Sequence, residues 1–171
     1  RTVNIPNHIF ITHCHSDHFF DLPIILSGIN NKKTNIFTPV NVGTVNNFIE
    51  SSMLLINNGK NKKIPEYQVN KVKPGQVINF SENKRDDQVE IFKCYHTVPA
   101  VGFGLAEVKK KLKKEYYGKS GKEIAELKKT KDIFELVNQY IITYLTDTTI
   151  QVFDDHNIFK YKYIIVECTI L

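Results

Sequence analysis

The chain has 171 residues, of which 42% are hydrophobic, so it can bury one ordinary core and is expected to form a single domain or part of one. Its net charge of +5 is modest, and no run of about 18 apolar residues is present, which argues against a membrane-spanning helix. Three widely spaced cysteines argue against a disulfide framework and favour a reducing, intracellular location.

The N-terminal third of the chain is expected to alternate strands with helices. Residues 8–12 combine β-branched and aromatic side chains and then switch abruptly to polar ones, which predicts a buried strand. Residues 19–28 and 42–56 carry apolar side chains near helical spacing, and residues 31–40 are expected to form a short strand between these two helices.

The later strands follow at irregular intervals. Residues 67–80 alternate polar and apolar side chains around Pro74 and the glycine after it, which predicts a hairpin. Apolar segments over 89–96, 139–147 and 161–171 predict further strands. Because strands outnumber helices and alternate with them irregularly, the pattern favours an α/β layered domain with mixed sheets over a doubly wound one.

The lysines of the chain are concentrated in one region. Residues 103–129 are expected to leave a strand and enter two basic helical pieces, broken at Gly118 and Gly121. Residues 107–132 hold ten lysines and five acidic residues, so the rest of the chain is neutral overall. This asymmetry suggests a partner of dense negative charge such as nucleic acid, although a solvated helix with Lys–Glu pairs would have the same composition.

The most distinctive motif is HCHSDH, directly after the first expected strand. His13 and His15 are two positions apart in an extended segment, so their side chains project to the same side and can hold one metal ion. The turn into the next helix redirects Asp17 and His18, which can hold a second ion. Two ions about 3.5–4 Å apart can share a hydroxide and clamp a phosphate. Imidazole and carboxylate ligands suit Zn²⁺, with Mn²⁺ or Fe as alternatives, whereas the plainer interpretation is a polar loop without metal.

A pair of metal ions needs further ligands from elsewhere in the chain. His96 and Asp147 each follow a predicted buried strand, as the HCHSDH motif does. A single residue at such a position is often a cap or a surface group. Because all three segments end apolar strands, we predict that His96 completes the first ligand set and that Asp147 bridges both ions.

These residues lie in segments that resemble ribonuclease Z, the tRNA 3′-processing endonuclease of the metallo-β-lactamase superfamily, and occur in the same order. The matching segments are FITHCHSDHFFDLPIIL, YHTVPAVGFGL, KKKLKKEYYGKSGKEIAELKK, YLTDTT and VECTIL. The resemblance implies an αββα sandwich of two mixed sheets with outer helices, and two Zn²⁺ ions. The implied ligands are His13, His15 and His96 for one ion, Asp17 and His18 for the other, and Asp147 as the bridge. Asp17 is also the implied catalytic residue, which handles the proton of the attacking water.

The resemblance also implies a substrate and a way of holding it. The enzyme would remove the 3′ trailer from precursor tRNA, and residues 105–131 would form a protruding basic arm that grips the tRNA. Lysines suit that role because they engage phosphates without reading sequence. The implied RNA-binding residues are Lys109, Lys110, Lys111, Lys113, Lys114, Lys119 and Lys122. The arm and the metal motif on one short chain resemble the short form of the family, which implies a homodimer. The expected location is intracellular, in the cytoplasm or nucleus, with an organelle as an alternative.

The pattern departs from the family at both ends. The family has a glycine-rich segment before the metal motif and histidines after the segment matching VECTIL, so residues 1–171 are expected to be a partial domain. The two remaining histidines, His8 and His156, match no family ligand and are expected to be a packed or surface residue and a solvent-exposed one. Without the histidine that would act as general acid, these residues alone are expected to be nearly inactive.

Two other functions use parts of the same pattern. A small-molecule hydrolase of the same fold, acting on a thioester, a lactone or a cyclic phosphodiester, needs the metal motif but has no use for a basic arm. A homologue with an incomplete metal site would bind tRNA without cutting it.

Overall fold

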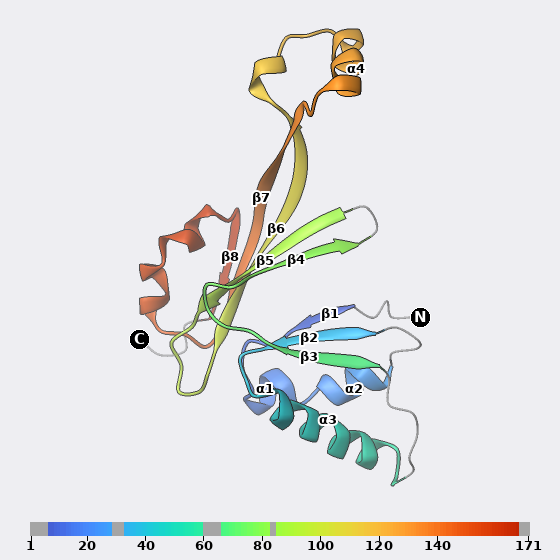
Figure 1. Ribbon diagram of the computed structural model, residues 1–171. Helices are drawn as coiled ribbons and strands as arrows, with labels where there is room; N and C mark the ends of the chain where they lie inside the picture. The colour runs from blue at the N-terminus through green and yellow to red at the C-terminus, as the bar shows by residue number, and fades with distance from the viewer. Residues whose placement is uncertain (1–6, 29–32, 60–65, 83–84, 168–171) are drawn as a thin grey trace.

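The computed structural model describes residues 7–28, 33–59, 66–82 and 85–167, which form two sheets and their covering helices (Figure 1). The first sheet has the order β1-β2-β3 with parallel pairing throughout the described strands. Its strands are β1 (His8–Phe10), β2 (Thr34–Thr38) and β3 (Tyr67–Lys71). These strands lie close to the expected positions but are shorter, and residues 31–32 of the second expected strand lie outside the described residues.

Three helices cover the outer face of the first sheet. They are α1 (Ser16–Phe19), α2 (Leu22–Ser27) and α3 (Val42–Ile56). Leu26 and Ile49 of the helices pack in one fully buried cluster with Ile36 of β2, which explains the helical spacing of their apolar residues. Helix α3 begins where Asn41 caps it, because the Asn41 side chain accepts hydrogen bonds from the next free backbone N–H groups.

The second sheet has the order β4-β5-β6-β7-β8, antiparallel except for the parallel pair β7–β8. Its strands are β4 (Val77–Glu82), β5 (Arg85–Lys93), β6 (Val101–Leu112), β7 (Phe134–Leu145) and β8 (Tyr163–Val166). The 3₁₀ helices η2 (Ile150–Asp154) and η3 (His156–Lys160) cover one face, where Val152 and Ile158 pack against Phe92 and Leu145.

The two sheets face each other across a third core. Phe10 and Phe37 from the first sheet pack there against Ile91 and Phe103 from the second. The order of layers is therefore helices, sheet, sheet and 3₁₀ helices, which confirms the expected αββα layering of an α/β domain. None of the helices in the described ranges is long and apolar enough to cross a membrane.

The prediction of a hairpin over residues 67–80 is wrong. Gly75 does make a turn with a φ of 82°, but β3 before it pairs with β2 and β4 after it pairs with β5. The turn therefore carries the chain from one sheet to the other. Local turn chemistry predicts where the direction changes and not which strand becomes the neighbour.

The prediction of a first basic helical piece within 103–129 is also wrong, whereas the prediction of the second is confirmed. Strand β6 continues through the lysines to Leu112, which pairs with Phe134 of β7. Pairing with β7 outweighs the helical propensity of the lysines. The chain then forms η1 (Lys114–Tyr116) and α4 (Gly121–Thr130), which begins with a capping box between Ser120 and Glu123.

The long β6–β7 hairpin carries η1 and α4 away from both sheets as a protruding arm (Figure 1). Pairing of the two strands is regular along the arm, from Ala106 with Tyr140 to Leu112 with Phe134. A bulge lies between Leu105 and Ala106, where β7 has one extra residue. The strand expected over 161–171 is present as β8, and residues 168–171, with Cys168, lie outside the described residues.

Candidate metal centre

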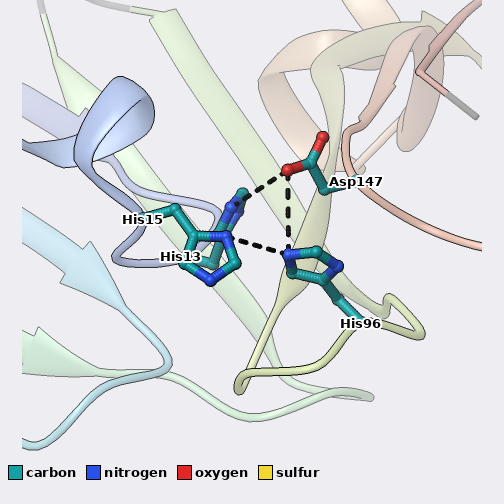
Figure 2. Close-up of side chains that lie close together, drawn as sticks. All are labelled: His13, His15, His96 and Asp147. Carbon is teal, nitrogen blue, oxygen red and sulfur yellow. Dashed lines mark hydrogen bonds and ion pairs between the residues drawn. The ribbon is translucent and has the colours of Figure 1, made fainter. Parts of the chain in front are cut away.

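Four potential metal ligands converge where three segments leave the sheets. His13 and His15 lie in the loop after β1, His96 lies after β5, and Asp147 lies after β7 (Figure 2). One ligand atom from each of the four residues lies within 4.8 Å of all the others. The structure thus brings together residues up to 134 positions apart in the sequence, all from the ends of strands.

The spacing of these atoms suits one small cation. His96 Nε2 is 3.0 Å from His15 Nδ1 and 3.7 Å from Asp147 Oδ2, and His13 Nε2 is 3.3 Å from the same oxygen. A tetrahedral zinc ion with bonds of about 2.0–2.1 Å holds its ligand atoms about 3.3 Å apart. The four donors therefore fit a zinc ion, and both nitrogen and carboxylate oxygen are ligand types that zinc accepts.

The state of His13 supports the same interpretation. Its side chain is 0% exposed, and its Nε2 has no hydrogen-bond partner among the described residues, although it points at Asp147. Burial, followed by the nearby His18, lowers the His13 pKa to about 4, so the ring is neutral at pH 7. Its Nδ1 lies 3.2 Å from Thr12 Oγ1, the kind of second contact that orients a ligating imidazole.

Asp17 and His18 lie beside this group on α1. His18 Nε2 is 3.3 Å from Asp17 Oδ2 and 3.5 Å from Asp147 Oδ2, and its ring centroid is 4.3 Å from that of His13. Asp147 Oδ2 therefore lies within 3.7 Å of a nitrogen of three histidines. The Asp17 side chain is 75% exposed, so it borders solvent at the edge of the group.

Two local features characterise the backbone at Asp147. Its φ of 45° is in the left-handed region, which aspartate tolerates better than most residues and which is common at functional sites. The loop around it is tied to the His96 loop at Tyr95, whose backbone N–H donates to Thr148 Oγ1 at 3.0 Å and whose carbonyl accepts from the Thr149 N–H at 3.3 Å. Thr148 was not predicted from the sequence, where its one signal is its position next to Asp147.

A cavity of about 780 Å³ opens next to the ligand group. His96 and Asp147 form part of its wall, and Lys93 and Tyr95 line it as well. Neither Lys93 nor Tyr95 was predicted from the sequence as a site residue. His8 and His156 lie elsewhere: His8 packs against Phe80, and His156 is exposed, as expected.

The arm lysines are remote from the ligand group, at the strands and helix of the protruding hairpin (Figure 1). Six of the seven are exposed, namely Lys109, Lys110, Lys111, Lys114, Lys119 and Lys122. Lys113 is partly buried, and its Nζ donates to the carbonyl of Asp132 at 2.6 Å, so it closes the base of the η1–α4 segment. Lys109 pairs with Glu107 at 3.1 Å.

The curated proteins similar to this chain include several ribonuclease Z proteins. No protein-family model matches the chain. The nuclear ribonuclease Z of Triticum aestivum is 31% identical over 124 residues, which cover 70% of this chain and 66% of that protein. A ribonuclease Z of Methanococcus maripaludis is 34% identical over 151 residues, which cover 84% of this chain and 46% of that protein.

A solved structure of human tRNase Z, short form, is 25% identical with a TM-score of 0.42, and the match covers 59% of this chain and 44% of that chain. This chain spans between about half and two thirds of the length of the curated relatives described above.

Proposed function

This chain belongs to the ribonuclease Z family, and from that premise we propose that the protein is a metal-dependent endoribonuclease that removes the 3′ trailer from precursor tRNA. The observation that carries the proposal is the convergence of His13, His15, His96 and Asp147 within 4.8 Å. Hydrolysis of a phosphodiester requires a water made nucleophilic at neutral pH and a cation that stabilises the developing charge. A metal held by these residues meets both needs.

The donor set favours a pair of zinc ions, with Mn²⁺ or Fe as other candidates. His13, His15 and His96 would hold one ion, Asp17 and His18 the other, and Asp147 would bridge them. The bridging role suits Asp147 because its Oδ2 lies 3.3 Å from His13 Nε2 and 3.5 Å from His18 Nε2. When bound, the ions supply Lewis-acid polarisation of the phosphate and lower the pKa of a coordinated water.

The protein side chains position the reactants and handle protons. The neutral His13 ring has a lone pair available at pH 7, so no proton has to leave before it can ligate. The Asp17 carboxylate reaches solvent at the edge of the group, where it can accept a proton from the attacking water. The products would be a tRNA with a 3′-hydroxyl and a trailer with a 5′-phosphate.

The arm would hold the tRNA away from the cleavage site. The exposed lysines of the arm include Lys109 and Lys111, which alternate with Lys110 along β6, so adjacent lysines lie on opposite faces of the hairpin. Their ammonium groups engage phosphates without reading sequence, which suits an enzyme that serves many tRNAs. We also propose that the protein forms a homodimer like the short form of the family, in which the arm of one subunit holds the tRNA bound by the other. The proposed location is the cytoplasm or the nucleus.

The test is cleavage of a precursor tRNA labelled at its 5′ end by the natively purified protein. We expect a single cut after the mature tRNA, loss of cutting with a chelator, and recovery on adding zinc. His15→Gln should abolish the cut, whereas His156→Gln, which changes an exposed histidine outside the ligand group, should leave it unchanged.

Two outcomes would contradict the proposal. Hydrolysis of a thioester, lactone or cyclic phosphodiester with no cutting of precursor tRNA would favour a small-molecule hydrolase. Tight binding of precursor tRNA by the metal-loaded protein, without any cutting, would favour a non-catalytic tRNA-binding homologue.

A further inference from the structure

The wall of the cavity beside the ligand group combines potential metal ligands with an aromatic ring and a lysine. His96 and Asp147 line it, so whatever fills the cavity adjoins the proposed reacting phosphate. Lys93 and Tyr95 line it too, and they are separated by one residue at the end of β5. An aromatic ring and a cation therefore lie directly beside a phosphodiesterase site.

The Tyr95 ring contacts a cation, and it remains accessible. The Lys93 Nζ lies 4.4 Å from the ring centroid, a cation–π contact that favours one orientation of both side chains. Hydrogen bonds to Thr148 and Thr149 fix the Tyr95 backbone on both its N–H and its carbonyl. Tyr95 nevertheless remains 36% exposed. A tyrosine has only two side-chain torsions and its backbone is held here, so the exposed ring loses little conformational entropy when a flat group stacks on it.

We infer that this cavity is a nucleotide subsite, in which the base adjoining the scissile phosphate stacks on Tyr95 and a neighbouring phosphate pairs with Lys93. The inference rests on the proposed function and adds to it the recognition of an unpaired nucleotide at the cleavage point. Single-stranded nucleotides are commonly held by aromatic stacking and backbone charge, and such contacts accept any base. The subsite thus grips the end of the tRNA acceptor without limiting which tRNA is processed.

The experiment measures binding rather than cleavage. The zinc-loaded protein is titrated against a single-stranded oligonucleotide of about six nucleotides with a non-hydrolysable linkage at the cleavage point. 2-Aminopurine replaces either the last tRNA nucleotide or the first trailer nucleotide, because its fluorescence falls when it stacks. Quenching at one of these positions supports the subsite and identifies the side of the cut that it holds.

The variants separate the ring from the charge. Tyr95→Leu should weaken binding about tenfold or more, the effect of losing one stacked base, whereas Tyr95→Phe keeps the ring and should stay within about twofold of the wild type. Lys93→Gln should reduce the salt dependence of binding by roughly one phosphate contact. The matched control is Tyr163→Leu, because Lys162 lies 5.0 Å from the Tyr163 ring centroid on β8, in a similar pair that does not line the cavity.

The possible outcomes distinguish the subsite from the enzyme activity. If Tyr95→Leu and Lys93→Gln bind the oligonucleotide as the wild type does, the subsite is overturned, even if the protein cuts precursor tRNA. If the protein cuts no precursor tRNA but binds the oligonucleotide through Tyr95, the subsite stands and the proposed function fails. Zinc content and melting temperature of each variant show whether the ligand group and the fold survive the substitution, and Lys93→Gln decides the matter if Tyr95→Leu loses zinc.

Discussion

The backbone N–H of Tyr95 donates a 3.0 Å hydrogen bond to Oγ1 of Thr148, and this contact joins the loop of His96 to the loop of Asp147. Thr148 is 3% exposed, so water does not replace the bond if the hydroxyl is removed. His96 Nε2 and Asp147 Oδ2 are 3.7 Å apart, and their separation depends on how the two loops meet. Thr148 is thus a positioning residue for the ligand group.

Thr148→Val is expected to weaken zinc binding about tenfold, the lower end of what loss of a ligand-orienting contact costs, and to destabilise the protein by about 1–3 kcal/mol. Thr148→Ser keeps the hydroxyl and should restore zinc affinity. Competition with a chromophoric chelator measures the affinity, and the visible spectrum of the Co²⁺ form reports the ligand geometry. A normal Co²⁺ spectrum and affinity in Thr148→Val would show that the hydroxyl only stabilises the fold.

Asp147 combines a charge with a left-handed backbone, and two variants separate them. Asp147→Asn removes the charge but tolerates the φ of 45°, so it should lose metal affinity while its metal-free form melts close to the wild type. Asp147→Ala should lose the same affinity and a further stability of about 1 kcal/mol from backbone strain. Melting curves in the presence of a chelator provide the comparison. Equal melting temperatures for the two variants would contradict the role assigned to the backbone.

The stability of the metal-free protein should depend on pH through His13. Its folded pKa of about 4 lies below the ordinary value of 6.5, so the unfolded chain binds the proton more readily. The contribution of neutral His13 to stability is therefore complete above pH 6.5 and is lost as the pH falls toward 4. Urea unfolding with a chelator across this range measures the effect. His13→Gln should flatten the profile, and an unchanged slope in that variant would assign the effect to other groups.

The arm makes a separate prediction about affinity and salt. Lys110→Glu combined with Lys111→Glu should weaken binding of precursor tRNA by at least tenfold and lower its salt dependence, because exposed phosphate contacts are lost. Zinc content should not change. A control is Lys33→Glu, which reverses the charge of an exposed lysine that pairs with Glu66 beside the first sheet. Gel-shift titrations at several salt concentrations test it, and equal losses for the arm and control variants would argue against a specific arm contact.

The convergence of His13, His15, His96 and Asp147 was predictable, because its main motif is local. Three of the six proposed ligands are histidines within HCHSDH, and strand ends are readable from the change between apolar and polar residues. His96 and Asp147 follow such ends, and the sandwich brings the ends together. The arm was harder to predict, because the pairing of Lys111 with Glu135 depends on a strand more than twenty residues away and not on the propensity of the lysines themselves.

No sequence pattern predicts the wall of the cavity. Lys93 and Tyr95 alternate along the end of a strand as many surface residues do, and only the loop after Asp147 makes them part of a cavity. The wrong hairpin has the same origin, since the residues around Gly75 specify a turn, and the partners of the flanking strands lie far away in the sequence.

The bulge at the root of the arm decides which lysines meet which neighbours far beyond it. Because β7 has one extra residue there, Lys111 lies opposite Glu135 and Lys110 opposite Leu136. If the pairing were regular there, with Ile141 opposite Ala106, Lys111 would lie opposite Leu136 instead. The irregular pairing at the root thus sets which side chain of β7 lies opposite each lysine of β6, all along the arm.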